Sequence, residues 1–358
     1  MDSAGAPEPV GHSRKPSSVP SLAAILPLKV SGRHYGENLA RVDVLFSSLL
    51  HHCSNDLFDE LIIVAPQAEV LLAKEYIAGW PELPLRVIGE AEHFEAFDRF
   101  TRPWQLRPWQ RQQIVKLNAP ALTDADYVLT LDPDVLILRS ITRSSLLPGG
   151  CALLQPEPRG VHAQRWHDAA DLLDMSVDLA SPGMVLTPAL LSRDILVALH
   201  DRLEECGGRP WMDVLLTSYC NWTEYTLYLL AAEHSGLLDS RHYWCVEGDD
   251  SDVAPLQVAS ETSIWDRRTA TAENLERLLS GADPGIFGVV QSNTGMPAEI
   301  LTEVVSGYLP VRRTSAPAAL APVPPSKLRE RFNTASRLVA SAVYRSWRKA
   351  RRILRDGR

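Results

Sequence analysis

Two acids one residue apart end an apolar, strand-like run in the middle of the chain. The run covers residues 127–131, and Asp132 and Asp134 follow it on either side of Pro133. In an extended chain, a period of two places both carboxylates on the same side. Like charges this close repel each other, and a shared divalent cation relieves that repulsion. Carboxylate oxygens suit hard ions, so the pair predicts a site for Mn²⁺ or Mg²⁺.

The same residues also fit a simple turn. Pro133 drives Asp132 toward extended backbone and cannot donate to a sheet ladder, so the strand should end here. On this interpretation Asp132 and Asp134 only open the turn. The surroundings of the pair have to decide between the two.

Two cations precede the acids on a helix-like segment, residues 109–117. Arg111 and Lys116 could bind a diphosphate there, with the Arg guanidinium able to contact two oxygens at once. The alternative is that both are ordinary solvated helix charges.

A further acid, Glu224, lies among aromatic residues in the segment 221–228. It could act as a general base on an acceptor hydroxyl, or orient the acceptor. Alternatively it merely suits the positive end of a helix. Asp213 is the second candidate for the base.

A polar loop, residues 291–295, follows a strand-like stretch late in the chain. Gln291 and Asn293 could line a nucleotide-sugar pocket, or the loop could simply cap the next helix. The sequence does not fix a third metal ligand. His242 and Asn293 are the candidates, with a structural role as the alternative for each.

Alternating strands and helices would position these residues. The first half predicts strands at 22–30, 60–65, 85–88 and 127–131, with helices at 38–51, 69–77 and 109–117. The second half predicts strands at 151–154, 184–187, 243–246, 263–265 and 286–290, with helices at 161–173, 188–205, 211–218, 224–234 and 296–305. This alternation predicts an α/β fold with a mostly parallel central sheet flanked by helices. The acids then end about the fourth strand, and ligands of open α/β sheets bind outside the carboxyl ends of the strands.

Composition divides the 358 residues into four parts. We expect a disordered tail at 1–21, a body at 22–312, a linker rich in Ala and Pro at 313–326, and a basic amphipathic helix at 327–358. The five cysteines are scattered and suit a reducing cytoplasm. No signal peptide or membrane span is predicted.

Charge separates the C-terminal part from the rest. The whole chain carries a formal net charge of −8 and residues 327–358 carry +9, so the remainder carries −17. An acidic body argues against nucleic acid as its partner. The basic segment predicts peripheral contact with an anionic membrane, at its inner face and near a lipid-linked acceptor, or else a solvated tail.

Four segments in order, residues 109–117, 125–135, 221–228 and 291–295, resemble a bacterial glycosyltransferase family similar to GT-A enzymes, with largely unassigned substrates. The resemblance covers roughly residues 22–311. It implies a GT-A-like fold and transfer of a hexose-like sugar from a nucleotide-sugar donor to a saccharide or lipid-linked acceptor. It also implies that Asp132 and Asp134 hold Mn²⁺ or Mg²⁺ against the donor diphosphate.

Two other classes stay open. A phosphohydrolase of the haloacid-dehalogenase type also carries two acids after an apolar strand, but that motif normally opens the domain, and it wants Thr or Val where this chain has Leu136. A binding module with a GT-A-like fold and no catalysis is the other alternative. The intact acidic pair and Glu224 argue against it.

Overall fold

The computed structural model describes residues 19–30, 35–100, 108–184, 187–218, 220–245, 257–281, 284–314 and Ser346. Its strands are β1 (Leu22–Pro27), β2 (Glu60–Ala65), β3 (Leu85–Gly89), β4 (Tyr127–Thr130), β5 (Val135–Ile137), β6 (Ala152–Leu154), β7 (Glu157–Pro158), β8 (Pro182–Gly183), β9 (Ala189–Ser192), β10 (His242–Trp244), β11 (Gln257–Ala259) and β12 (Gly285–Val289). Its helices are α1 (Tyr35–His52), α2 (Val70–Ile77), α3 (Glu90–His93), α4 (Glu95–Arg99), α5 (Pro108–Leu117), α6 (Ala119–Leu122), α7 (Arg143–Leu146), α8 (Ala163–Leu172), α9 (Arg193–Gly207), α10 (Trp211–Leu216), α11 (Glu224–Ser235), α12 (Leu238–Arg241), α13 (Ala272–Leu279) and α14 (Ala298–Ser306).

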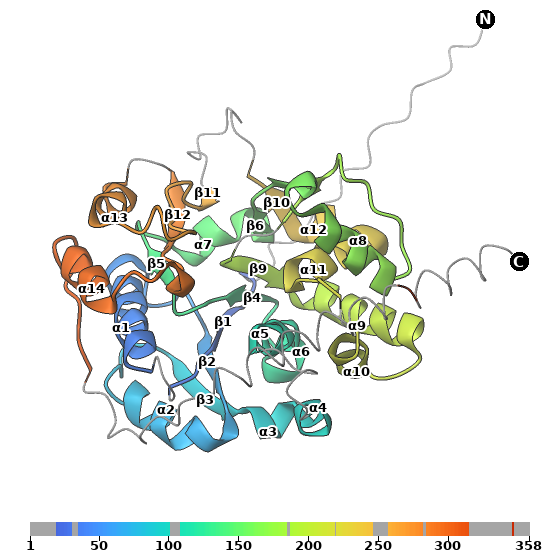
Figure 1. Ribbon diagram of the computed structural model, residues 1–358, viewed down its shortest axis with the longest axis horizontal. Coiled ribbons are helices and arrows are strands. Elements are labelled where there is room, and N and C mark those ends of the chain that lie inside the picture. Colours follow the sequence, from blue (N-terminus) through green and yellow to red (C-terminus); the bar gives the residue numbers. More distant parts are fainter. Residues whose placement is uncertain are drawn as a thin grey trace, which may run out of the picture.

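The central sheet has five strands in the order β3-β2-β1-β4-β9 (Figure 1). The first four are parallel, and β9 pairs antiparallel with β4. The predicted α/β class with a mostly parallel central sheet is therefore confirmed. The chain steps from β1 to β2 on one side and later returns to place β4 on the other side of β1. This reversal makes the gap between the carboxyl ends of β1 and β4 the switch point at which such sheets bind ligands.

Alternate residues of each inner strand face opposite helix layers, because successive side chains of a strand point to opposite faces. In β1, Leu22, Ala24 and Leu26 belong to the core cluster that contains the apolar residues of α1 and α2. Ala23 and Ile25 belong to the cluster that contains those of α5, α9 and α11. The sheet is thus covered on both faces (Figure 1), which explains why its strands are apolar throughout.

A second, smaller sheet, ordered β11-β12-β5, lies beside the first. The chain enters it directly from β4, because β5 begins only five residues after β4 ends. There β5 pairs antiparallel with β12, with Val135 opposite Val289. The acids Asp132 and Asp134 therefore lie at the junction of the two sheets.

The second half of the chain departs from the prediction in several places. The predicted strand at 184–187 lies partly outside the described residues, and its described ends, Met184 and Thr187, are not in a strand. The helical start at Pro188 is wrong, because β9 follows Pro188 and the helix α9 begins at Arg193. The run Ala189–Ser192 is buried throughout, and so short an apolar run does not by itself distinguish strand from helix. The predicted strand at 263–265 is wrong as well, because Ile264 makes only an isolated bridge to Val290. The prediction also missed β5, β11 and α13.

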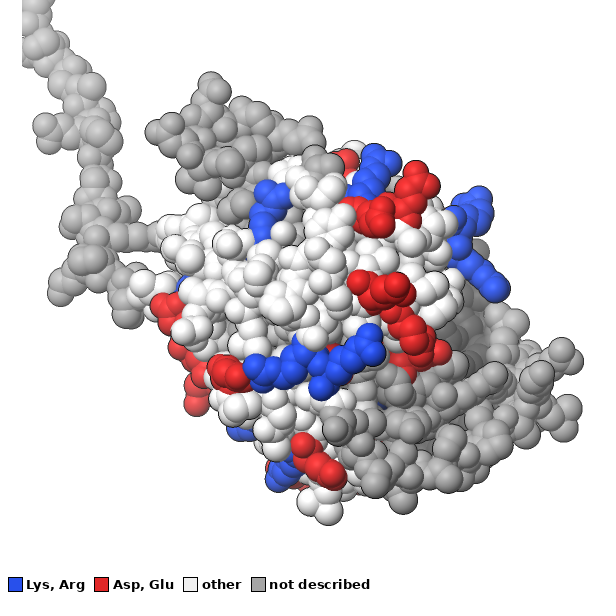
Figure 2. Space-filling model, turned by 90° about the vertical axis from the view of Figure 1, so that its left-hand side faces the viewer, with Lys and Arg blue, Asp and Glu red and all other residues white. Residues whose placement is uncertain are grey.

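The predicted tail, linker and basic helix fall mostly outside the described residues. In the described part of the chain, no helix is both long and apolar enough to cross a bilayer. Figure 2 shows the side of the molecule on which α13 and α14 lie. Over the described atoms of this face, basic and acidic side chains are interspersed, so the fields of the two signs largely cancel there.

Candidate active site

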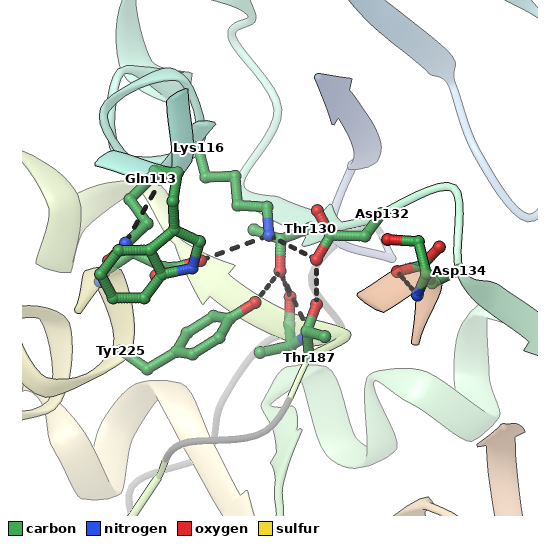
Figure 3. Close-up of polar contacts among 11 residues, drawn as sticks. Gln113, Lys116, Thr130, Asp132, Asp134, Thr187 and Tyr225 are labelled. Atoms are coloured by element: carbon green, nitrogen blue, oxygen red, sulfur yellow. Dashed lines mark hydrogen bonds and ion pairs between the residues drawn. The ribbon is translucent and has the colours of Figure 1, made fainter. Parts of the chain in front are cut away.

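The acidic pair lies in a β-turn that joins the two sheets. The Val135 N–H donates to the Asp132 carbonyl oxygen over 3.1 Å, and Pro133 occupies the second turn position, which its fixed φ favours. The expectation of an extended chain through both acids is therefore wrong. The carboxylates nevertheless lie close enough to interact: burial and, less strongly, the charge of Asp132 raise the pKa of the Asp134 carboxyl, and Figure 3 shows the two residues next to each other.

Lys116 joins two acids that are far apart in the sequence. It is 3% exposed, and its Nζ donates to Asp132 Oδ2 over 3.0 Å and to Glu224 Oε1 over 3.3 Å. Burial works to lower the pKa of Lys116, but the negative charges around it outweigh burial and raise it well above its ordinary value. The lysine is therefore an ammonium ion at neutral pH, and it brings Asp132 and Glu224 together.

Three elements hold this cluster in place. Lys116 belongs to the last turn of α5, whose residues pack against β1. Asp132 follows β4, and the Thr187 hydroxyl donates to its Oδ2 over 3.1 Å. Thr187 can do so because β9 runs antiparallel to β4 with Ala189 opposite Thr130, which carries the preceding residues back past Asp132 (Figure 3).

Glu224 is the first residue of α11 and is buried. Thr223 caps this helix through a capping box with Thr226, a pattern that satisfies otherwise free N–H groups. The Glu224 N–H donates to Gln113 Oε1 over 3.0 Å, which links α11 to α5. Burial raises the pKa of the Glu224 carboxyl, and the Lys116 ammonium opposes that rise. The capping and the functional interpretations of Glu224 are thus compatible, because the capping is done by Thr223.

Asp134 is held by the loop that follows β12. The Ser292 N–H donates to its Oδ2 over 2.8 Å, and the Val290 N–H donates to its carbonyl oxygen over 2.9 Å. The buried Arg41 of α1 lies 3.7 Å from its Oδ1. Burial raises the pKa of the Asp134 carboxyl, and Arg41 works against this rise.

The other predicted residues lie apart from this cluster. Arg111 pairs with Glu90 over 2.7 Å at the carboxyl end of β3 and lies over the Phe97 ring. Asp213 pairs with Arg99 over 2.7 Å, and the contacts of the described residues do not join it to Lys116 or Asp132.

The loop residues Gln291 and Asn293 follow β12, next to the residues that hold Asp134. Gln291 is half-buried and Asn293 is exposed. Asn293 thus lies one residue from Ser292, whose N–H binds the second acid.

His242 is placed as a structural residue. Its Nε2 lies 2.7 Å from the Tyr228 hydroxyl and its Nδ1 lies 3.2 Å from the Ala152 carbonyl oxygen, so both ring nitrogens are occupied. Burial lowers the pKa of His242 to about 4. It therefore has no free nitrogen to offer a metal at the acidic pair.

The chemistry of the acidic pair fits a divalent cation that is shared with a ligand. Among the described residues, Lys116 and Thr187 both donate to Oδ2 of Asp132, and the cation paired with Asp134 Oδ1 is Arg41 at 3.7 Å. Each acid thus keeps an oxygen outside these hydrogen bonds. Among the described residues, no group of three or more His, Cys, Asp or Glu could form a metal site. Mg²⁺ sites commonly use one or two carboxylates and complete their coordination with substrate phosphates and water.

Residues that the sequence analysis did not single out complete the site. They are Arg41, Thr130, Thr187, Tyr225 and Ser292. The Tyr225 hydroxyl lies 3.0 Å from Thr130 Oγ1, and Lys116 Nζ lies 5.9 Å from the centre of the Tyr225 ring. Thr130, Tyr225 and Ser292 lie in segments that carry the family resemblance, 125–135, 221–228 and 291–295, whereas Arg41 and Thr187 lie outside all four.

Comparisons with known proteins identify a family model and several solved structures. The model, described as a family of unknown function (DUF6492), matches residues 19–313. None of the curated proteins compared with the chain matches it. Apo mouse xyloside xylosyltransferase 1 is 13% identical with a TM-score of 0.44, over 77% of this chain and 99% of that one.

Two further solved structures are comparably distant. The galactosyltransferase LgtC with donor and acceptor sugar analogs is 13% identical with a TM-score of 0.43, over 81% of this chain and 97% of that one. Glucosyl-3-phosphoglycerate synthase from Mycobacterium tuberculosis, with Mn²⁺, uridine diphosphate and glucosyl-3-phosphoglycerate, is 14% identical with a TM-score of 0.33, over 65% and 75%. All three are glycosyltransferases, but likenesses this distant leave the activity of the chain to be argued from its own site.

Proposed function

The chain belongs to the family of unknown function DUF6492, and from its site we propose that it is a metal-dependent glycosyltransferase that uses a nucleotide-sugar donor. The observation that carries the proposal is the gathering of Asp132, Lys116 and Glu224 at the carboxyl end of β4. This is the switch point of the sheet, where ligands of α/β proteins bind.

The acidic pair would hold Mn²⁺ or Mg²⁺ through Asp132 and Asp134. When bound, such an ion neutralises charge on the diphosphate and makes it a better leaving group. The formal charges of Asp132, Asp134, Glu224, Lys116 and Arg41 sum to −1, which leaves the site ready to accept a cation.

The rest of the sheet edge would receive the nucleoside. Glu90 is the residue directly after β3, and Arg111 forms an ion pair with it. Both therefore lie at the same edge of the sheet as Asp132, because parallel strands end together. Gln291 and Asn293 would line the opposite side, next to Asp134.

Glu224 and the exposed Trp109 would serve the acceptor. Trp109, Gln113 and Lys116 lie on one face of α5, since residues four and three positions apart share a helix face. Trp109 is 45% exposed, whereas Gln113 and Lys116 are buried, so Trp109 marks the outer end of this face. Its ring could stack on an acceptor sugar. Of the two carboxylate oxygens of Glu224, Oε1 accepts a hydrogen bond from another described side chain and Oε2 does not. Oε2 would therefore be available to an acceptor hydroxyl. Asp213 remains the second candidate for the base.

A thermal-shift screen of UDP-, GDP- and TDP-sugars, with and without Mn²⁺, tests the proposal. At a donor concentration of 100 times its Kd, binding should stabilise the fold by roughly 2.7 kcal/mol. The expected result is a stabilisation by one donor that requires Mn²⁺ and that Asp134→Ala abolishes. Stabilisation by no donor, together with hydrolysis of a generic phosphate ester, would instead indicate the phosphohydrolase alternative. No donor binding and no hydrolysis would indicate the binding module.

The location of the enzyme is proposed from residues 327–358, which lie outside the described residues apart from Ser346. Their basic, amphipathic sequence favours contact with anionic lipid at the inner face of a membrane. Sedimentation with anionic liposomes tests this contact. Equal pelleting of chains with and without residues 327–358 contradicts it.

A further inference from the structure

Arg41 is a buried arginine in the middle of α1 that reaches both ends of the loop after β12. It is 2% exposed. Its Nη1 donates to the Val290 carbonyl oxygen over 2.6 Å, and its Nη2 donates to the Met296 carbonyl oxygen over 2.9 Å. The two N–H groups of one planar guanidinium thus close a loop of seven residues, a task that the rigid fork of arginine suits and the single ammonium of lysine does not.

This loop in turn holds the second acid of the site. Between the two carbonyls that Arg41 binds, the Ser292 N–H donates to Asp134 Oδ2. The Val290 N–H donates to the Asp134 carbonyl oxygen from the start of the loop. The direction of the Asp134 carboxylate therefore depends on a loop whose ends Arg41 ties together.

We propose that Arg41 is a positioning residue for the metal–diphosphate site: it holds the loop of residues 290–296 against Asp134 and so fixes the carboxylate that binds the cation. The inference rests on the proposed function, because it concerns the same acidic pair. Lys116 holds Asp132 from one side of the pair, and Arg41 holds Asp134 from the other.

Among the described residues, Asp134 is the acid that the charge of Arg41 can stabilise. Its only carboxylate neighbour there is Asp134, at 3.7 Å, and its Nε has no hydrogen-bond partner. Burying a guanidinium is unfavourable unless it is paired and hydrogen-bonded. A neutral donor would be enough to tie two carbonyls together, so the retained charge points to the acid beside it.

Arg159 provides a matched control, because it is equally buried and far from the site. It is 1% exposed, and it donates to the Pro182 and Asp178 carbonyl oxygens and to Glu233. It therefore ties a loop together as Arg41 does, but next to no acid of the proposed site.

The experiment measures Mn²⁺ binding to the full chain without donor, from the electron paramagnetic resonance signal of free Mn²⁺. Loss of a residue that orients a metal ligand typically weakens metal affinity by about 10–100-fold. We therefore expect Arg41→Lys, which keeps the charge but not the fork, to raise the Kd for Mn²⁺ at least about tenfold. Arg159→Lys should stay within about twofold of the wild type. Equal Kd values for Arg41→Lys and the wild type overturn the inference.

A second pair of variants keeps the test decisive if Arg41→Lys does not fold. Ser292 is the first residue of a 3₁₀ turn after an extended Gln291, a position at which proline is tolerated. Ser292→Pro removes the N–H that binds Asp134, and Ser292→Ala lacks the same hydroxyl but keeps the N–H. A weaker Mn²⁺ affinity of Ser292→Pro than of Ser292→Ala supports the inference, and equal affinities refute it. If the wild type binds no Mn²⁺, the metal dependence in the proposed function is itself wrong. This outcome differs from one in which the wild type binds Mn²⁺ and the variants bind it equally well.

Discussion

Replacing Lys116 by Met tests whether the buried lysine is the shared counter-ion of two acids. The substitution keeps most of the volume and removes the charge. Asp132 and Glu224 would then lose their common partner, and Glu224, with 6% of its side chain exposed, would be left as an unpaired buried carboxylate.

The size of the effect follows from the geometry. Lys116 Nζ lies 3.0 Å from Asp132 Oδ2 and 3.3 Å from Glu224 Oε1. For an effective dielectric constant near 20, the attraction within each of these ion pairs is about 5 kcal/mol. Most of this is offset by the desolvation of the charges, and breaking a buried pair by removing one partner is typically worth about 3–5 kcal/mol. We expect Lys116→Met to lower the free energy of unfolding by about this amount.

The assay is urea unfolding of Lys116→Met, Glu224→Gln and the double variant. In the double variant the side chain at position 224 is a neutral amide, so the loss should be smaller than the sum of the two single losses by more than about 0.5 kcal/mol. Arg86→Met is the control: Arg86 pairs with Glu60 over 2.8 Å, but 43% of its side chain is exposed. For such an exposed pair we expect a loss of about 1 kcal/mol or less. Losses that simply add for Lys116 and Glu224 would show that the two residues are not coupled and refute the reasoning.

Two further predictions concern acid stability and the acceptor. The pKa of the buried His242 is lowered to about 4, so the unfolded chain takes up this proton below about pH 6.5 but the folded chain only below about pH 4. The stability that His242 contributes above pH 6.5 is therefore lost as the pH falls toward 4. Between pH 7.5 and 5, the free energy of unfolding measured in urea should fall by about 2 kcal/mol less in His242→Asn than in the wild type. Equal decreases would contradict the lowered pKa of His242. Trp109→Ala should raise the acceptor KM about tenfold, the loss of roughly 1.5 kcal/mol of ring contact, and leave the Kd for Mn²⁺ unchanged; a parallel loss of Mn²⁺ binding would show that Trp109 supports the fold instead.

The first half of the fold could be predicted from the sequence because its signals are strong and alternate. The strands Glu60–Ala65 and Leu85–Gly89 match their predicted starts, and the acids do follow the fourth strand. The helical start predicted at Pro188 failed because the four buried residues after Pro188 form the strand β9. Whether such a run pairs with β4 depends on the tertiary context, and the hydrophobic periodicity of the sequence gives no information about that context.

The same limit applies to the site. Asp132, Lys116 and Glu224 could be named as candidates from the sequence because each is a charged residue at the end of a regular element, but the ion pairs that join them could not. Thr187 and Ser292 could not, because they reach the acids only through the antiparallel pairings of β9 with β4 and of β12 with β5. Arg41 carried no signal, since an arginine beside the apolar stripe of an amphipathic helix normally points into solvent.

The turn and the metal site, opposed as alternatives at the level of the sequence, turn out to be one structure. The turn at Pro133 moves the chain from the first sheet into the second, so Asp132 is held by the first sheet and Asp134 by the loop after β12. The two acids therefore have independent supports, with Lys116 on one and Arg41 on the other. Because Thr187 precedes β9 of the first sheet and Ser292 follows β12 of the second, a shift between the sheets would change the separation of the carboxylates. Ligation of one cation by both acids would accordingly couple the two sheets.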